Sequence, residues 1–559
     1  MKRVHAHLAQ AIEQALVQMG VNAPTVTLEK PRDASHGDIA TNAALVHSKQ
    51  VGKPPRQIAD ALIGAMQLDP SLVKCEGVAG PGFINFRFAD AYLQSIAELA
   101  YLTKDSYGTT RDLSGKRVLI EFVSANPTGP LNVVSARAAA VGDSLTRIFR
   151  ALGAECHSEF YVNDAGNQVE LLGQSVFAKI VQIKGGEREI PEGGYHGDYI
   201  TASAQNHVDL NYDKIFEEKL AERIGKFSAE IFTQAFIEEL GRLEMKRHIG
   251  NHEQTLAKFR VKMDRWFFES DLRSSKADLE AFKALEERGT IFEKDGAKFV
   301  RTSGFGDGQD WVVVTSQGKP TYFLPDIAYH WDKFRRGYDH IIDILGPDHH
   351  AYLTKMAAAM AALGEDAKRL EIMLLQHINL LRDGEPVKMS KRAGQIIEMD
   401  ELLDEVGIDA ARYFFLLRRT STPLDFDIEL AKRQSDDNPV FYVQYAHARI
   451  ESIFKRGGVE APQKPEHLEL LAHPEELTLL RRLRELGDVM NECAFSRDPH
   501  AMTVWLREVA AQFHRFYHHC RVLTTPAELQ TARLCLCRAT QIALQRGLAL
   551  CGISAPTEM

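Results

Sequence analysis

Residues 121–143 read EFVSANPTGPLNVVSARAAAVGD and have the build of a strand, a turn and a helix. Residues 118–120 and 122–123 form a short apolar run that suits a buried strand, and the NPTGP turn at 126–130 ends it. Apolar residues then recur at helical spacing over residues 136–148. A helix that begins just after a strand turns its free N–H groups toward the crevice beyond the strand's carboxyl end. Open α/β sheets bind phosphates there, so this segment predicts a nucleotide site.

The length and composition indicate an ordinary globular protein with several domains. The chain has 559 residues, of which 45% are hydrophobic and 26% are charged, and about three or four domains are expected. The formal net charge is -9, so RNA binding would rest on local basic patches. The seven cysteines are scattered without CxxC spacing, which predicts a reducing, cytoplasmic location. No apolar run approaches the ~20 residues of a membrane span.

A basic loop far along the chain narrows the class of nucleotide-binding protein that residues 121–143 could belong to. Residues 383–394 read DGEPVKMSKRAG, with three cations among residues 388–392. That pentapeptide resembles the KMSKS signature of class I aminoacyl-tRNA synthetases, and residues 130–135 lie where that class carries its HIGH signature. With YVNDAGNQ at 161–168 and the block at 442–450, the chain resembles bacterial-type arginyl-tRNA synthetase over nearly its whole length. No Walker A pattern occurs, which leaves a P-loop kinase or ATPase without support.

The predicted fold class is α/β, with a doubly wound parallel sheet of the Rossmann type, because apolar strands alternate with helices in the middle of the chain. With the resemblance, this predicts an N-terminal α+β domain that contacts the tRNA elbow, a catalytic domain with a mostly helical insertion, and an all-α anticodon-binding bundle. The expected ranges are 1–112, 113–404 with the insertion at about 172–305, and 405–559. The predicted strands of the sheet's second half are 311–314, 340–345 and 370–375.

The resemblance implies an arginine-tRNA ligase. Such an enzyme activates L-arginine with ATP as arginyl adenylate and transfers it to the terminal 2′-hydroxyl of tRNA(Arg), releasing AMP and pyrophosphate. Mg²⁺ would enter with the nucleotide, and tRNA must usually be bound before activation in this family. No protein metal site is predicted, because neither His349-His350 nor the histidines near Cys520 have a second spaced ligand pair. A monomer is expected.

The predicted nucleotide contacts come from both signatures. Lys388 and Lys391 suit the neutralisation of a triphosphate as charge moves to the leaving group, and Asn132 and Ser135 would donate hydrogen bonds to phosphate oxygens. These four residues are the predicted catalytic group. The predicted ATP-binding residues are Pro130, Asn132, Ser135, His349, Met389 and Ser390.

Arginine recognition calls for carboxylates that accept a planar guanidinium by a bidentate fork. The resemblance implies that Glu121 and Asp326 hold the guanidinium and that Tyr322 packs on or beside it. Asn126 would bind the α-amino group. Tyr322 and Asp326 also lie at helical spacing, so a plain surface pair stays an alternative for them.

The predicted tRNA contacts are Tyr442, Tyr445, Arg449 and Met559, which match positions near the family's anticodon contacts. Splayed RNA bases stack on aromatic rings and guanidinium planes. A helical bundle also needs aromatic core residues, so core packing stays the alternative for each ring.

The first signature departs from the family's pattern, which reads Pro-Leu-His-Val-Gly-His-Ala-Arg at residues 130–137. This chain has Asn132 in place of the first histidine, Val134 in place of the glycine and Ser135 in place of the second histidine. Glycine lets adenine lie against the backbone, and a β-branched side chain should hinder it. Two functions therefore stay open: an active ligase with an altered grip on ATP, and a catalytically impaired, synthetase-like tRNA-binding protein. The retained basic loop and arginine-binding residues favour the active ligase.

Overall fold

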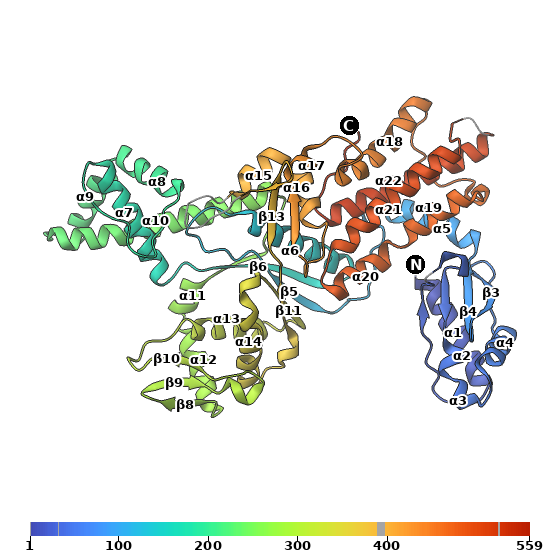
Figure 1. Ribbon diagram of the computed structural model, residues 1–559, viewed down its shortest axis with the longest axis horizontal. Coiled ribbons are helices and arrows are strands. Elements are labelled where there is room, and N and C mark those ends of the chain that lie inside the picture. The colour runs from blue at the N-terminus through green and yellow to red at the C-terminus, as the bar shows by residue number, and fades with distance from the viewer. Residues whose placement is uncertain (1, 32, 388–396, 524–525) are drawn as a thin grey trace.

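A five-stranded parallel sheet lies at the centre of the computed structural model, which describes residues 2–31, 33–387, 397–523 and 526–559 (Figure 1). The strand order is β12-β11-β5-β6-β7, and all neighbours are parallel. These strands are β5 (Arg117–Glu121), β6 (Glu155–Val162), β7 (Arg265–Phe268), β11 (His340–Leu345) and β12 (Leu370–Leu374). The order reverses between β5 and β11, which defines a topological switch point. The predicted α/β fold class is confirmed.

Helices cover both faces of this sheet (Figure 1). α6 (Val133–Ala151) packs on one face with Val118 and Ile120, whereas α13 (Phe323–Arg335) and α14 (His350–Ala362) pack on the other with Leu119. Side chains alternate along a strand, so Glu121 points to the same face as Leu119. The last residue of β5 is thereby directed toward α13.

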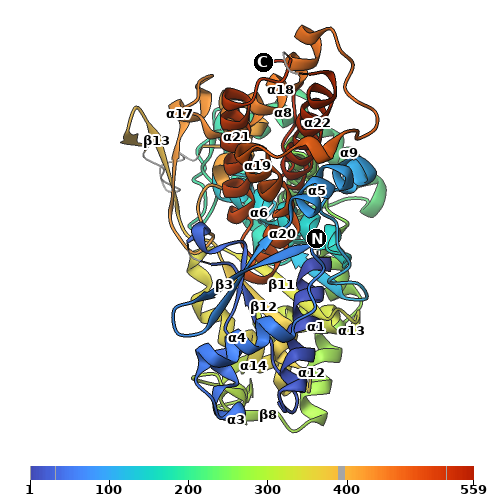
Figure 2. The same cartoon turned by 90° about the vertical axis from the view of Figure 1, so that its right-hand side faces the viewer.

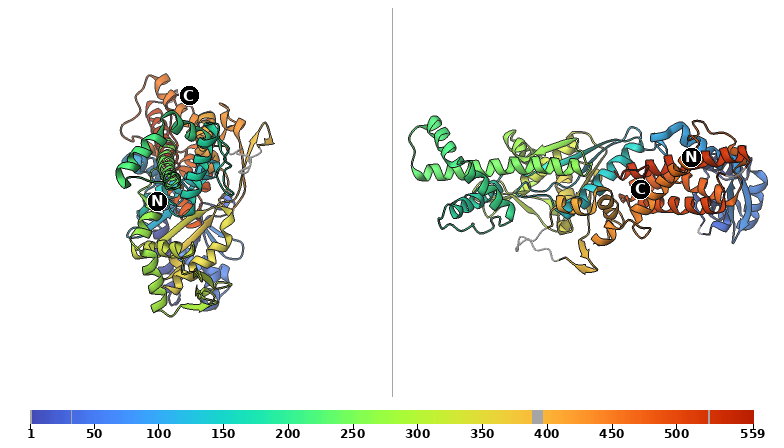
Figure 3. Two further views of the ribbon diagram at one scale, coloured as in Figure 1. Left: turned by 90° about the vertical axis from the view of Figure 1, so that its left-hand side faces the viewer. Right: turned by 90° about the horizontal axis from the view of Figure 1, so that it is seen from above.

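The region predicted as a helical insertion, residues 172–305, divides into parts. The helices α7 (Asn167–Ile183), α8 (Asp198–Asp209), α9 (Tyr212–Ile224) and α10 (Ala229–Lys258) form an arm with its own hydrophobic core. The arm projects from the end of the molecule opposite the N-terminal unit (Figure 3). After the arm the chain returns as β7, which pairs with β6 and extends the parallel sheet.

A second, antiparallel sheet follows with the order β10-β9-β8. Its strands are β8 (Ile291–Lys294), β9 (Ala297–Val300) and β10 (Trp311–Val314). The prediction that residues 311–314 belong to the parallel sheet is wrong. β8 and β9 form a tight hairpin around Asp295 and Gly296, and β10 pairs with the edge of that nearby hairpin. A four-residue apolar run identifies a strand but does not specify which edge it joins.

The N-terminal unit contains a four-stranded antiparallel sheet, with strand order β1-β2-β4-β3, and helices that pack on it (Figure 2). Its main elements are α1 (Lys2–Gln18), β1 (Leu28–Glu29), β2 (Ile39–Thr41), α4 (Pro55–Ala65), β3 (Val73–Ala79) and β4 (Phe83–Phe88). The next helix, α5 (Asp90–Thr103), packs against the C-terminal bundle and so connects the two parts of the molecule.

The C-terminal part is a helical bundle made of α18 (Pro439–Gly457), α19 (Pro474–Arg484), α20 (Leu486–Ser496), α21 (His500–His519) and α22 (Ala527–Leu550). It is joined to the catalytic part through α15 (Met399–Val406) and α16 (Ile408–Phe415). Among the described residues, none of the helices combines the length and apolar character needed to cross a bilayer.

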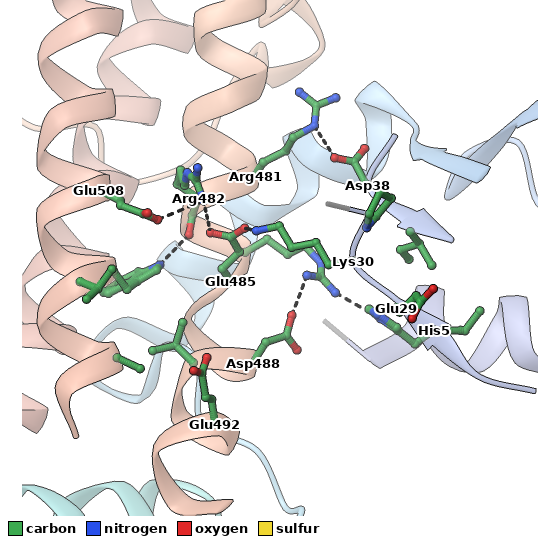
Figure 4. Close-up of a pocket in the computed structure, with 18 of the residues that line it drawn as sticks. His5, Glu29, Lys30, Asp38, Arg481, Arg482, Glu485, Asp488, Glu492 and Glu508 are labelled. Carbon is green, nitrogen blue, oxygen red and sulfur yellow. Dashed lines mark hydrogen bonds and ion pairs between the residues drawn. The ribbon is translucent and has the colours of Figure 1, made fainter. Parts of the chain in front are cut away.

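A cleft of 990 Å³ separates the N-terminal unit from the bundle, and charged side chains line it (Figure 4). Ion pairs cross it: Lys30 Nζ lies 2.7 Å from Glu485 Oε1, and Arg481 Nε lies 2.9 Å from Asp38 Oδ1. Because these charges already have protein partners, the cleft is a polar junction between two parts of the chain.

Candidate active site

Three carboxylates form a row across the middle of the parallel sheet. Glu121 on β5 is the register partner of Glu159 on β6 and of Asp343 on β11. Neighbouring strands are about 4.8 Å apart, so the three acids are close together. All three residues are buried, with exposed fractions of 6% or less. Like charges this close destabilise one another unless cations or hydrogen-bond donors compensate them.

The compensating groups come from α13 and the residue that follows it. Lys333 Nζ is ion-paired with Glu121 Oε2 and lies 2.7 Å from Asp343 Oδ1. Arg336 holds Glu159 by two hydrogen bonds of 2.6 and 2.8 Å. The Tyr329 hydroxyl oxygen lies 2.8 Å from both Glu121 and Glu159. Burial would lower the pKa of Lys333, but Asp343 and Glu121 raise it above the usual value, so this lysine is charged.

Asp326 lies one helical turn before Tyr329 on the same face of α13. Burial raises the pKa of Asp326 to about 6, with Glu269 and Glu121 adding to the shift and His330 and Lys355 opposing it. The Asp326 carbonyl oxygen and the Asp343 carboxylate both bind the ring of His330, each at 2.8 Å. The predicted arginine carboxylates, Glu121 and Asp326, thus belong to one electrostatic cluster.

The turn after β5 has strained backbone. Val123 and Ser124 adopt left-handed conformations with φ of 72° and 40°, which are unfavourable for residues with a side chain, especially a β-branched one. The Ser124 hydroxyl donates to Glu121 Oε1 at 2.7 Å and accepts the N–H of Tyr161 at 3.1 Å. This turn leads to Asn126, which is exposed at the carboxyl edge of the sheet.

The start of α6 differs from the prediction of free N–H groups there. Asn132 is the N-cap, and its Oδ1 accepts the N–H of Val134 at 2.9 Å and of Ser135 at 3.2 Å. Asparagine is among the best capping residues, which explains how this sequence begins the helix without the family's histidine. Ser135 is buried, whereas Val134 is 47% exposed. A phosphate at this helix would have to compete with the cap for these N–H groups.

The long helix of the arm, α10, contacts the turn at residues 126–130 that precedes α6. His252 on α10 donates from Nε2 to the carbonyl oxygen of Gly129 at 2.8 Å. A side chain at Gly129 would approach the ring of Tyr199 on α8 to 3.1 Å, so the arm packs tightly here. On the other side, the N–H of Met399 donates to the carbonyl oxygen of Leu131 at 2.8 Å. The first signature therefore lies between the arm and the residues that follow the basic loop.

The remaining predicted nucleotide and arginine contacts occupy the neighbouring helix starts. Tyr322 is the N-cap of α13 and is 71% exposed, and Pro130 is half-buried before α6. His349 is exposed at the N-cap of α14, and its ring centroid lies 6.1 Å from that of Tyr352. The predicted loop residues Lys388, Met389, Ser390 and Lys391 lie outside the described residues.

Three of the predicted tRNA-binding residues, Tyr442, Tyr445 and Arg449, lie on α18 of the bundle, and Met559 is the last residue of the chain. Tyr442 and Tyr445 have ring centroids 5.1 and 6.0 Å from that of His514 on α21. The Arg449 guanidinium lies over the ring of Tyr517, 4.7 Å from its centroid. Tyr445 is 37% exposed and Met559 is 53% exposed, so both offer surface to a partner. Burial lowers the pKa of His514 to about 4, which leaves that ring neutral near pH 7.

Several residues of the site were missed in the sequence. Asp343 is an acid inside the apolar strand β11, and this was a usable signal, since an isolated buried charge is costly. Glu159 lies in β6, where polar and apolar residues are mixed, so its signal was weaker. Lys333 and Tyr329 follow Asp326 at spacings of seven and three residues, which places them on one helix face. Their partners, however, come from strands far away in the sequence.

The doubly wound sheet, the carboxylates at its switch point and the helical bundle after it define a class I aminoacyl-tRNA synthetase. Residues 99–417 match the family described as tRNA synthetases class I (R), catalytic domain. Residues 2–88 match the arginyl tRNA synthetase N terminal domain, and residues 443–559 match the DALR anticodon binding domain. The chain belongs to the arginyl-tRNA synthetase family.

Full-length relatives agree with this assignment. The arginine–tRNA ligase of Carboxydothermus hydrogenoformans is 41% identical over 567 residues, covering 100% of this chain and 99% of that protein. That of Listeria welshimeri is 42% identical over 557 residues, covering 99% of this chain and 98% of that protein. The structure of Thermus thermophilus arginyl-tRNA synthetase shares the fold, with a TM-score of 0.75, 24% identity and 99% coverage of both chains.

Proposed function

We propose that the protein is an arginine-tRNA ligase. It activates L-arginine with ATP to arginyl adenylate and transfers the arginyl group to the 2′-hydroxyl of the terminal adenosine of tRNA(Arg). AMP and pyrophosphate are released. Membership of the family and the full-length similarity to arginine–tRNA ligases support this activity.

The acidic excess at the switch point is the observation that carries the proposal. Glu121, Glu159 and Asp343 bring three negative charges, whereas Lys333 and Arg336 bring two positive ones. Arg265 adds a longer, partly exposed ion pair to Glu159 at 3.8 Å, and Asp326, which has no ion pair among the described residues, brings a further negative charge when it ionises. Buried clusters with an unmatched charge bind a counterion, and a guanidinium fits because it is always protonated and planar.

The proposed chemistry consists of positioning and charge stabilisation, because the carboxylate of arginine itself attacks the α-phosphate. Glu121 and Asp326 bind the guanidinium, Tyr322 packs beside it, and Asn126 binds the α-amino group. The nucleotide is held by Pro130, Asn132, Ser135 and His349, together with Met389 and Ser390 of the basic loop. Lys388 and Lys391 stabilise the departing pyrophosphate.

ATP is the energy source of class I synthetases, and Mg²⁺ is proposed to enter with its phosphate oxygens. The anticodon arm of tRNA(Arg) is proposed to bind the surface formed by Tyr442, Tyr445, Arg449 and Met559. The exposed Tyr445 ring, with the partly buried Tyr442 and Arg449 beside it, supports base stacking there. A cytoplasmic location and a monomeric state stay predictions.

The alternative, a tRNA-binding protein without catalysis, is not favoured. It was based on the altered first signature, yet Asn132 restores a well-capped helix start and the carboxylate row is complete. Full-length arginine–tRNA ligases at 41–42% identity also favour the active enzyme.

Aminoacylation with purified tRNA, ATP and Mg²⁺, run with each amino acid separately, tests the proposal. Arginine alone should be attached to tRNA. Absence of arginyl-tRNA in the presence of salt-sensitive tRNA binding would instead support the non-catalytic binder. A matched reaction with Asp326→Asn identifies charging that depends on the cluster.

A further inference from the structure

Lys333 is completely buried, yet it carries a charge and has two carboxylate partners. Its side chain is 0% exposed, and it bridges Glu121 on β5 and Asp343 on β11. The ammonium also lies over the ring of Tyr329, 4.4 Å from the centroid. The long side chain thus extends from α13 to the two strands that meet at the switch point.

This contact determines which part of Glu121 faces a ligand. A carboxylate has roughly four lone-pair positions. On Glu121, Oε2 is contacted by Lys333 and by the Tyr329 hydroxyl, whose single proton is shared with Glu159, and Oε1 accepts one hydrogen bond from Ser124. Counting the contacts made by the described residues, one position remains, on Oε1. Glu121 can accept a single N–H from a guanidinium in this arrangement, and not the two-bond fork that the sequence predicted for it.

We propose that Lys333 is a positioning residue for arginine recognition, which fixes Glu121 Oε2 inward and leaves Oε1 as the acceptor for the substrate guanidinium. The inference rests on the proposed function. Without the lysine, Glu121 loses its charged inward partner, keeps the weaker hydroxyl contacts of Tyr329 and Ser124, and is left beside Asp343 with no cation between them. The substrate guanidinium would then meet an acceptor in the wrong place.

A purely structural role is the competing explanation. In that case Lys333 would serve only to neutralise Asp343, which is 2% exposed and whose pKa, despite burial, is lowered to about 2 by Lys333 and His330. Removing Asp343 as well would then restore both stability and activity, because a neutral pair needs no lysine. The two roles are separated by comparing Lys333→Met with the double variant Lys333→Met/Asp343→Asn.

The experiment measures arginine and ATP kinetics by aminoacylation of tRNA, with thermal unfolding of each variant. Lys333→Met is expected to raise the KM for arginine by about 10- to 100-fold, the loss typical of a charge-assisted contact. The kcat and the KM for ATP should stay within about threefold, because the lost contact serves ground-state arginine binding. Lys116→Met is the matched control, since Lys116 makes a surface ion pair with Asp339 at 3.5 Å.

The double variant decides between the roles. It should unfold at a higher temperature than Lys333→Met, because no buried charge is left unpaired at Asp343, yet it should keep the raised KM for arginine. Asp343→Asn alone keeps the Lys333 pair with Glu121 and should raise this KM less than Lys333→Met does. A wild-type KM in the double variant, or an equal rise for ATP and arginine, would overturn the inference. If the wild-type enzyme itself failed to charge arginine, the proposed function would be wrong instead.

Discussion

Lowering the pH from 7 to 5 is expected to weaken arginine use through protonation of Asp326. Burial raises the pKa of Asp326 to about 6, so its charge is lost within this interval. The substrate guanidinium keeps its charge throughout, because its pKa lies far higher. Below its pKa the Asp326 carboxyl is neutral, and above it the carboxyl is charged. The attraction of Asp326 for the arginine guanidinium is therefore present above about pH 6 and is lost below about pH 6.

The magnitude follows from the pKa. With a value of about 6, roughly 90% of Asp326 is ionised at pH 7 and roughly 10% at pH 5, which is a change of about tenfold. Bound guanidinium stabilises the ionised form, so kcat at saturating arginine should change less than kcat/KM does. The acid limb of kcat/KM reports the pKa of the free enzyme.

The assay is aminoacylation at several pH values between 5 and 8, at constant ionic strength and saturating ATP and tRNA. The kcat/KM for arginine should fall with an apparent pKa near 6. Asp326→Asn serves as the control, because it should have low kcat/KM and lack this limb. A limb near pH 4, or a flat profile between pH 5 and 7, would show that the carboxylate is not perturbed as the structure indicates.

Other variants test the nucleotide site and the scaffold. Val134→Gly is expected to lower the KM for ATP, because it removes an exposed β-branched side chain from the first turn of α6, and an unchanged or raised KM would show that the backbone has accommodated valine. Lys388→Ala and Lys391→Ala should slow ATP–pyrophosphate exchange while barely changing tRNA affinity, whereas equal loss of both would mean that the loop is an RNA clamp. Arg412→Met should lower the free energy of unfolding by about 3–5 kcal/mol in denaturant melts, because Arg412 is fully buried and paired with Asp143; a loss below 1 kcal/mol would contradict this.

The fold was largely predictable because its signals are local. The strand before Phe122, the turn and α6 could be read from hydrophobic period and turn residues. The partner of β10 could not be read, because a short apolar run pairs with whichever edge is near it after folding. The cap formed by Asn132 was also missed, although asparagine before a helix is a known start signal.

The sequence by itself determined the α/β class and, through its two signatures, the family to compare. Through that resemblance it also implied that Glu121 and Asp326 bind arginine, which stays a prediction. The tertiary structure decided how those carboxylates are charged and oriented, since Glu121 meets Lys333 only when α13 packs across β5 and β11. The physical reason is that pairing between strands and helices distant in the sequence depends on three-dimensional packing. Hydrophobic period and residue spacing carry information only about the segment in which they occur, and not about the segment that will pack against it.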